Sequence, residues 1–315
     1  MKKILEVVVC LLLMIGVVAC SSKSNTLDLK KTNELQDMNL TFISADTVSQ
    51  VQPGIPSQYS FVYKAETNHI LDLVFKVENK TTQTIKINDT FSTKVKINEE
   101  DEKNGYFIYE PSTRTSVTKT GSLDAQSTGS LHLCTTIDKN VEVKDINVVL
   151  IIDETEYELS GTLSDFQANK VYKKIGEKVT IDNKAEMTLE KLSTVDKVLP
   201  SKPTGMYQYF TANDTSKDTL LVLKTTVKNI SSSALSLKDL MGYGVKIDGE
   251  STYGNSVYEK VDGSTLTSTT LGTVEANQSL TVYFMVEIAK ESKDKSMEVQ
   301  LVTEDGLYFI QNNIK

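Results

Sequence analysis

The feature that most constrains the fold is an internal duplication. Residues 70–79 (ILDLVFKVEN) line up with residues 220–229 (LLVLKTTVKN) at an offset of 150 residues. The match extends on both sides with offsets between 147 and 151. Four of the five prolines fall at matched positions: Pro53 and Pro56 in the first copy, Pro200 and Pro203 in the second. Such a repeat indicates two copies of one structural unit that differ by small loop insertions.

The duplication divides the chain into a first copy at 37–160, a linker at 161–172 and a second copy at 173–315. After the matched strands, residues 123–125 pair with 274–276 at an offset of 151. The next apolar pairs match at an offset of 149: Leu131 and Leu133 with Leu280 and Val282.

Both copies carry the pattern of β-strands. Apolar and polar residues alternate through 71–78 and 280–287, which is typical of strands with one buried face. Turn signals such as Asn104-Gly105 and Asp248-Gly249 separate these runs. We therefore predict an all-β chain of two tandem immunoglobulin-like antiparallel β-sandwiches. The chain has no Trp, so the Cys–Trp–Cys core of antibody domains is excluded.

The N-terminal residues have the pattern of a signal peptide, which predicts an exported protein. Two lysines follow Met1, and the apolar run 7–19 has 13 residues, fewer than the roughly 20 that span a membrane. We assign 1–19 to a signal-peptide helix. Residues 17–20 (VVAC) resemble the lipobox of bacterial lipoproteins, which implies cleavage before Cys20 and a diacylglycerol on its sulfur. The resemblance implies a lipid-anchored, extracytoplasmic protein, since two acyl chains hold a protein firmly on a membrane.

Residues 20–36 are polar and lack periodicity, so we expect a flexible tether between the lipid and the first copy. Cleavage removes Cys10, and lipidation uses Cys20. Cys134 is then the remaining thiol, and no intramolecular disulfide can form. We expect Cys134 to be a small buried hydrophobe in a strand.

The second copy carries a family resemblance. It opens with residues 172–179 (YKKIGEKV) and continues with a strand at 187–192. A second strand at 220–227 ends in Lys228-Asn229. These segments resemble the immunoglobulin-like domain of uncharacterised Gram-positive lipoproteins, related to the mycobacterial immunoprotective extracellular protein family. The resemblance implies a sandwich fold and an envelope location, and it implies neither catalysis nor functional residues.

The charge and the motifs of the sequence limit the classes of function that the chain can have. The chain has 34 basic and 42 acidic residues, a net charge of −8, which argues against nucleic acid as a partner. His69 and His132 stand outside any catalytic motif, and we expect both to be ordinary exposed histidines. The sequence therefore predicts no catalytic residue and no cofactor.

Two acidic runs, 99–102 and 153–156, are candidates for calcium, which prefers oxygen ligands. The spacing of an EF-hand is missing from both. We favour solvated loops and predict no metal site, with calcium at Glu99–Glu102 as the open alternative.

Aromatic residues give the one candidate binding surface. Met206, Tyr207 and Tyr209 lie in a loop of the second copy that also contains Gly205. The alternative is that Tyr209 and Phe210 begin a strand and fill the sandwich core, as Phe61 would in the first copy. We expect this more for Phe210 than for Tyr207.

The sequence thus predicts a lipid-anchored binding or scaffold protein of the cell envelope without catalysis of its own. Its partners would be the membrane, through Cys20, and an envelope protein or glycan. One alternative is an accessory subunit of a membrane transporter or wall-synthesis enzyme. A remote alternative is a hydrolase with an unfamiliar site, which would require ionisable residues clustered in one pocket.

Overall fold

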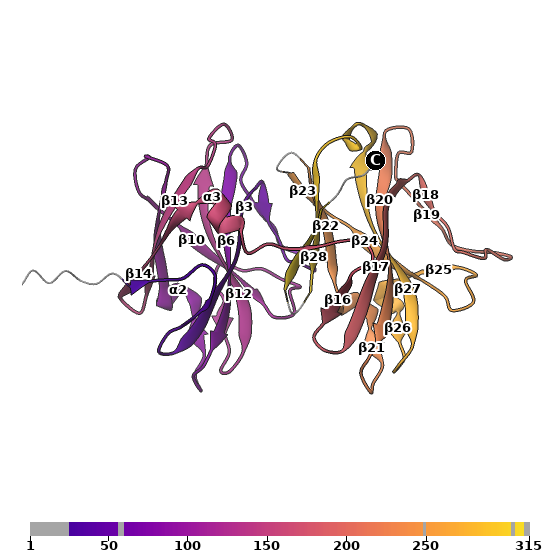
Figure 1. Cartoon of the computed structure of the whole chain (residues 1–315), viewed down its shortest axis with the longest axis horizontal. Coiled ribbons are helices and arrows are strands. Elements are labelled where there is room, and N and C mark those ends of the chain that lie inside the picture. The colour runs from indigo at the N-terminus through magenta and orange to yellow at the C-terminus, as the bar shows by residue number, and fades with distance from the viewer. Residues whose placement is uncertain (1–24, 56–59, 248–249, 304–305, 312–315) are drawn as a thin grey trace, which may run out of the picture.

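Backbone hydrogen bonds pair the strands into sheets, and their alternating apolar side chains form the cores of two β-sandwiches. The sandwiches lie side by side along the long axis of the molecule (Figure 1). This computed structural model describes residues 25–55, 60–247, 250–303 and 306–311. The all-β prediction is confirmed. The predicted signal peptide 1–19 and the lipidation site Cys20 lie outside the described residues.

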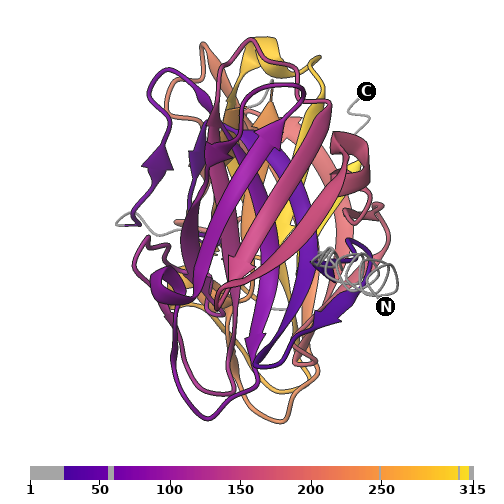
Figure 2. The same ribbon diagram turned by 90° about the vertical axis from the view of Figure 1, so that its left-hand side faces the viewer.

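Sandwich 1 consists of two five-stranded sheets. Sheet 1A has the order β10-β12-β6-β3-β2: Tyr106–Pro111, Thr128–Ile137, His69–Asn79, Met38–Val48 and Thr32–Glu34. Sheet 1B has the order β1-β14-β13-β8-β9: Asn25–Thr26, Thr155–Thr162, Asp145–Ile152, Phe91–Ile97 and Lys103–Asn104. Figure 2 views the molecule from this end, with sandwich 1 in front of sandwich 2.

Sandwich 2 repeats this arrangement. Sheet 2A has the order β16-β17-β20-β27-β24-β25: Lys178–Ile181, Ala185–Val195, Asp218–Asn229, Ser279–Ala289, Asn255–Glu259 and Leu266–Ser268. Sheet 2B has the order β15-β29-β28-β22-β23: Val171–Lys173, Leu307–Gln311, Met297–Val302, Gly242–Ile247 and Glu250–Tyr253. In chain order, the main strands of both sandwiches follow the ABED and CFG sheets of the immunoglobulin fold.

Short elements complete each sandwich. Two-stranded pairs join β4 to β5 (Gln50–Val51, Tyr63–Lys64), β7 to β11 (Ile85–Lys86, Ser122–Leu123), β18 to β19 (Lys197–Val198, Phe210–Thr211) and β21 to β26 (Leu235–Ser236, Thr273–Val274). The helical segments are α2 (Ile87–Thr90), α3 (Leu163–Gln167), η1 (Leu237–Asp239), η2 (Thr269–Leu271) and η3 (Lys290–Ser292).

The two copies share local details, as two copies of one structural unit should. Strands β3 and β17 carry a register shift at the same place, between Phe42 and Ser44 and between Leu189 and Lys191. At the end of the next strand, the Asn79 amide donates to the carbonyl oxygens of residues 83, 123 and 124. The Asn229 amide donates in the same way to those of residues 233 and 274. Each Asn thereby satisfies backbone oxygens where two loops meet.

The strand register corrects the match between residues of β12 and residues of β27. Leu131 lies opposite Phe75, and Val282 lies opposite Thr225, so Leu131 corresponds to Val282 at an offset of 151. Leu133 likewise corresponds to Phe284, so the predicted offset of 149 for this strand is wrong. A pattern with a period of two matches itself after a shift of two residues, and only strand pairing decides between the two alignments.

The predicted tether is part of sandwich 1 from Asn25 onward. Strand β1 pairs in parallel with β14, and the buried Leu27 donates its N–H to the carbonyl of Glu158. Leu29 and Leu35 pack against the same core. The edge of sheet 1B offers unpaired backbone groups to this segment, and its apolar side chains gain burial.

The predicted linker 161–172 is also shorter in the structure. Thr162 and Asp165 form a capping box that starts α3. Phe166 of this helix is fully buried in the core of sandwich 1. Only residues 168–170 remain between α3 and β15 of sandwich 2.

A charged seam joins the sandwiches, where the outer face of sheet 1A meets sheet 2B (Figure 1). Asp46 of β3 lies 3.0 Å from Nζ of Lys170 and 2.9 Å from Nζ of Lys246. Lys170 also lies 2.9 Å from Glu298, and its side chain is only 3% exposed. Burial lowers the pKa of Lys170, but the two carboxylates outweigh it and raise the pKa. A lysine so deeply buried stays charged only when it is paired.

Close backbone packing accompanies these charges. A Cβ on Gly242 would overlap the carbonyl oxygen of Gly54, so only glycine fits at this point of the seam. The Asn169 amide donates to the carbonyl oxygens of Leu29 and Phe42. The seam therefore holds the sandwiches in one relative placement.

Candidate functional site

A cluster of buried ionisable groups lies on the outer face of sheet 1A. Asp72 lies on β6 and His132 on the neighbouring strand β12. His132 is paired with Val74, so Asp72 is its diagonal neighbour on the same face. The carboxylate oxygens of Asp72 lie 2.9 and 3.1 Å from His132 Nδ1. His132 is 8% exposed, so the prediction that it is an ordinary exposed histidine is wrong.

Glu110 lies on the other side of the imidazole. One of its carboxylate oxygens accepts the backbone N–H of Gly54 at 2.7 Å. The other lies 3.3 Å from Nη1 of Arg114 and 3.8 Å from His132 Nε2. Together with Gln300 and Val302 of sandwich 2, these side chains line a cavity of about 80 Å³ at the seam.

The charges of this cluster support one another. Burial by itself would lower the pKa of His132, but the carboxylates of Asp72 and Glu110 outweigh it and raise the pKa to about 10. Burial would raise the pKa of Glu110, yet His132, Arg114 and the Gly54 N–H hold it below its usual value. At neutral pH an imidazolium therefore lies between two carboxylates.

Sandwich 2 retains the glutamate of this arrangement but not the His–Asp pair. Glu259 corresponds to Glu110, and its carboxylate accepts the backbone N–H of Ser201, the counterpart of Gly54. The position of His132 is taken by Tyr283, whose hydroxyl donates to Glu259 at 3.2 Å. The glutamate that holds a loop is therefore common to both copies, and the His–Asp pair is specific to the copy that sandwich 2 covers.

Catalysis by a serine requires a hydroxyl within reach of a base. Within the described part of the chain, His132 Nε2 makes no hydrogen bond. Its neighbour is the Glu110 carboxylate rather than a nucleophile. The arrangement is suited to a structural role, as a buried ion pair within sandwich 1 on the face that sandwich 2 covers.

The other sequence candidates fall in ordinary places. Cys134 is buried in β12, as predicted, and burial raises the pKa of its thiol well above the usual value. His69 is half-buried at the start of β6. In the acidic run 99–102, Glu100 pairs with Lys103 at 2.7 Å and Glu102 with Lys94 at 3.4 Å. The described ranges contain no group of three or more metal-ligating side chains.

The candidate surface around Met206 lies in the loop between β18 and β19. Met206 is fully exposed, Tyr207 is 40% exposed and Tyr209 is 49% exposed. The two tyrosine rings are 6.2 Å apart, and Nζ of Lys197 lies 4.4 Å from the centre of the Tyr209 ring. These three residues thus lie at the surface and near one another.

Phe210 has a different role from the one expected. It packs with Val198 and Val222 on the outer face of sheet 2A, beneath the β18–β19 hairpin, and not in the core between the sheets. Phe61 is 80% exposed, so the expectation that it fills the first core is also wrong. Each hairpin covers a second apolar cluster outside its sandwich, which strand periodicity does not reveal.

A polar groove of about 460 Å³ opens beside the same sheet. Its walls include Phe210, Asn213, Asn255, Ser256 and Glu287, with Ile55 contributed by sandwich 1. Asn213 holds both carboxylate oxygens of Glu287, at 3.0 and 2.7 Å. The size falls in the range of small-molecule sites.

The fold defines the chain as an all-β protein of two tandem immunoglobulin-like sandwiches. Among solved structures, it is similar to an uncharacterized beta-sandwich protein from Clostridium difficile 630. That match has 21% sequence identity and a TM-score of 0.41, and it covers 45% of this chain and 95% of the other. Comparisons with protein families and with curated proteins give no match. In the described part of the chain, no helix has both the length and the apolar character that crossing a membrane requires.

Proposed function

We propose that this protein is a lipid-anchored, extracytoplasmic binding protein of the cell envelope, without catalysis of its own. One observation carries the proposal: large exposed apolar side chains lie on two loops of sandwich 2, 199–209 and 260–265, which hydrogen bonds from Lys202 to Gly263 and from Gln208 to Thr265 join. We call this set the distal patch, and it consists of Leu199, Met206, Tyr207, Tyr209 and Val261. Tyrosine and methionine are enriched at protein interfaces, and clustered exposed apolar groups mark interaction sites.

The position of the distal patch supports this function. The described chain begins at β1 beside β14, at one end of the long axis, and the β18–β19 hairpin lies at the opposite end (Figure 1). A lipid on Cys20 would be joined to β1 by about five residues, which on average span only about 12 Å when flexible. Sandwich 1 would then lie close to the membrane and would present the distal patch outward.

The finer family assignment is part of the same proposal. The lipobox-like residues 17–20 and the segments at 172–179 and 220–229 support membership in the Gram-positive lipoproteins with immunoglobulin-like domains. A role as accessory subunit of a transporter or wall-synthesis enzyme would use the same surface. A hydrolase would need a cluster of ionisable side chains such as Asp72, Glu110 and His132. The loop contact that Glu110 shares with Glu259 favours a structural role for this cluster.

Replacing Cys20 with Ala tests the anchor. We expect the protein to leave the membrane fraction or to accumulate as an uncleaved precursor, because the thiol that accepts the lipid is gone. Fractionation and mass spectrometry of the N-terminus measure both effects. The matched control is Cys10→Ala, which should be processed normally. Equal membrane retention of the Cys20 variant, with normal cleavage and no lipid in the wild type, would reject the anchor.

Replacing Met206 and Tyr207 together with Ser tests the distal patch. Exposed substitutions change stability by about 0.5 kcal/mol or less, so the melting temperature should stay near that of the wild type. Capture of partners from the organism's own envelope fraction should be lost. Tyr172→Ser, at a tyrosine that is 46% exposed on β15, is the matched control and should leave capture unchanged. A lowered melting temperature with intact capture would assign the two residues to the fold.

A further inference from the structure

Within this molecule, one sandwich already packs against the other. The outer face of sheet 1A receives sheet 2B, and the loop after β4 takes part in the contact. Gly54 of this loop is held by the Glu110 carboxylate, and its carbonyl packs against Gly242. In addition, the N–H of Ile55 donates to the carbonyl of Arg114 at 2.8 Å. Two joined loops thus form part of the surface on which a sandwich sits.

Sandwich 2 builds the same two loops. The segment between β4 and β5 (52–62) and that between β18 and β19 (199–209) have equal lengths. Ser201 is held by Glu259 as Gly54 is held by Glu110. The N–H of Lys202 donates to the carbonyl of Gly263 at 2.8 Å, as Ile55 does to Arg114. The docking framework is therefore duplicated along with the fold.

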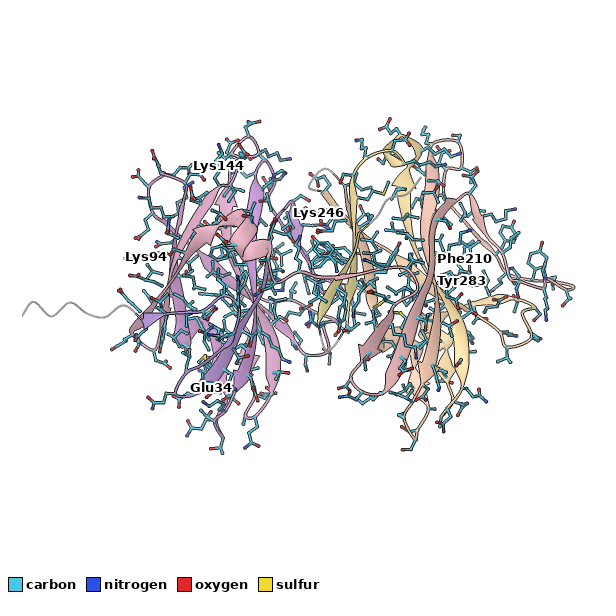
Figure 3. All side chains as sticks on the ribbon, in the orientation of Figure 1. Glu34, Lys94, Lys144, Phe210, Lys246 and Tyr283 are labelled. Carbon is cyan, nitrogen blue, oxygen red and sulfur yellow. The ribbon has the colours of Figure 1, made fainter. Side chains whose placement is uncertain are left out.

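In the described part of the chain, no other sandwich covers these loops in sandwich 2, although the β18–β19 hairpin covers Val222 and Met285 on the sheet beside them. Three buried seam positions of copy 1 have counterparts that are exposed or half-buried in copy 2: Ser44 and Lys191, Asp46 and Ser193, Gly54 and Ser201. Figure 3 shows Lys246 at the seam and both Phe210 and Tyr283 on the opposite side of sandwich 2. The distal patch lies on the duplicated loops themselves. The face that binds a sandwich in copy 1 is thus partly open in copy 2, where it carries Lys191 and Lys224, and the apolar distal patch lies on the loops beside it.

We propose that the outer face of sheet 2A, with the distal patch, docks a β-sandwich domain of another envelope protein. The partner would present one open sheet face, as sheet 2B does to sheet 1A. This inference rests on the proposed function and adds the class of partner. It follows from the equivalence of the two faces, because the occupant that the face accepts within this molecule is a sheet of a sandwich.

A second copy of this chain fits the surface less well. Its sheet 2B is already covered by its own sandwich 1. Its sheet 1B is free, but exposed charges stand on that face: Lys94, Lys96, Glu156 and Glu158. Figure 3 shows Lys94 on the side of sandwich 1 that points away from the seam. The outer face of sheet 2A also carries charges, at Lys191 and Lys224, so the position of sheet 1B decides: under the proposed anchor it would lie near the membrane, away from the distal patch of another copy.

The test is site-specific crosslinking in the membrane-anchored full chain. Photoreactive benzoylphenylalanine replaces Tyr207 in one variant and Tyr209 in another. The matched control places it at Tyr172, which is similarly exposed but lies on the edge of sheet 2B. After irradiation of intact cells, mass spectrometry identifies the crosslinked peptides. Circular dichroism of each variant shows whether the fold is retained.

We expect crosslinks from 207 and 209, but not from 172, to peptides on a sheet face of a β-sandwich domain. Crosslinks to a second copy of this chain, to a glycan, or to a protein of another fold would overturn the inference while leaving the binding function intact. A folded protein that gives no crosslink, and whose Met206 and Tyr207 variant keeps full capture, would overturn the proposed function as well.

Discussion

Replacing Phe75 with Ala is expected to lower the free energy of unfolding of sandwich 1 by about 3–5 kcal/mol. Phe75 is fully buried in the core, and its ring centre lies 5.2 Å from that of Phe42 in an edge-to-face arrangement. Phe42 in turn lies 5.4 Å from Phe166 of α3. The substitution therefore opens a cavity and removes one aromatic contact from a chain of three rings.

The measurement is chemical denaturation followed by circular dichroism, because the chain has no Trp for fluorescence. Phe61→Ala is the matched control in the same sandwich, since its side chain is 80% exposed, and it should change stability by about 0.5 kcal/mol or less. A loss below about 1 kcal/mol for Phe75→Ala would mean that the core closes around the gap.

Replacing His132 with Gln is expected to destabilise the protein by about 3–5 kcal/mol at pH 6, the cost of breaking a buried ion pair. The effect should depend on pH. The unfolded chain releases the imidazole proton near pH 6.5, whereas the folded pKa of His132 is about 10. The folded state therefore holds more protons between these values. The stabilisation is complete below about pH 6.5 and is lost as the pH rises toward 10.

Denaturation midpoints of wild type and variant at pH 6, 8 and 10 measure this difference. We expect it to shrink steadily as the pH rises. His69→Gln, which lies outside the cluster at the start of β6, is the control and should follow the wild type at each pH. A difference that is the same at all three pH values would mean that His132 acts through packing rather than through its charge.

The periodicity of the sequence carries most of the fold. Strand β8 (FSTKVKI) alternates strictly between buried and exposed residues, as its pattern predicts. Strand β6 departs from this rule in its first half, where residues 70–73 are all buried. Each residue there still points to the face that its position indicates. The outer face is buried because the β4–β5 hairpin and sandwich 2 cover it.

For the candidate site, too, the sequence predicts the face on which a side chain lies but not its burial. His132 alternates with Leu131 and Leu133, so its direction away from the core of sandwich 1 follows from the sequence. Its burial does not, because the groups around it come from distant segments: Gly54, Glu110 and the strands of sandwich 2. A signal was nevertheless present, since Glu110 and Glu259 occupy matched positions after Tyr109 and Tyr258.

The sequence by itself determined the all-β class and the two copies, because these depend on local alternation and on the repeat. The tertiary structure decided the exact alignment of β12 with β27 and the place of residues 25–36 on sandwich 1. It also decided which sheet face became a seam and which stayed open. A period of two specifies the face on which a side chain lies. What covers that face depends on contacts between residues far apart in the chain, and no local pattern encodes them.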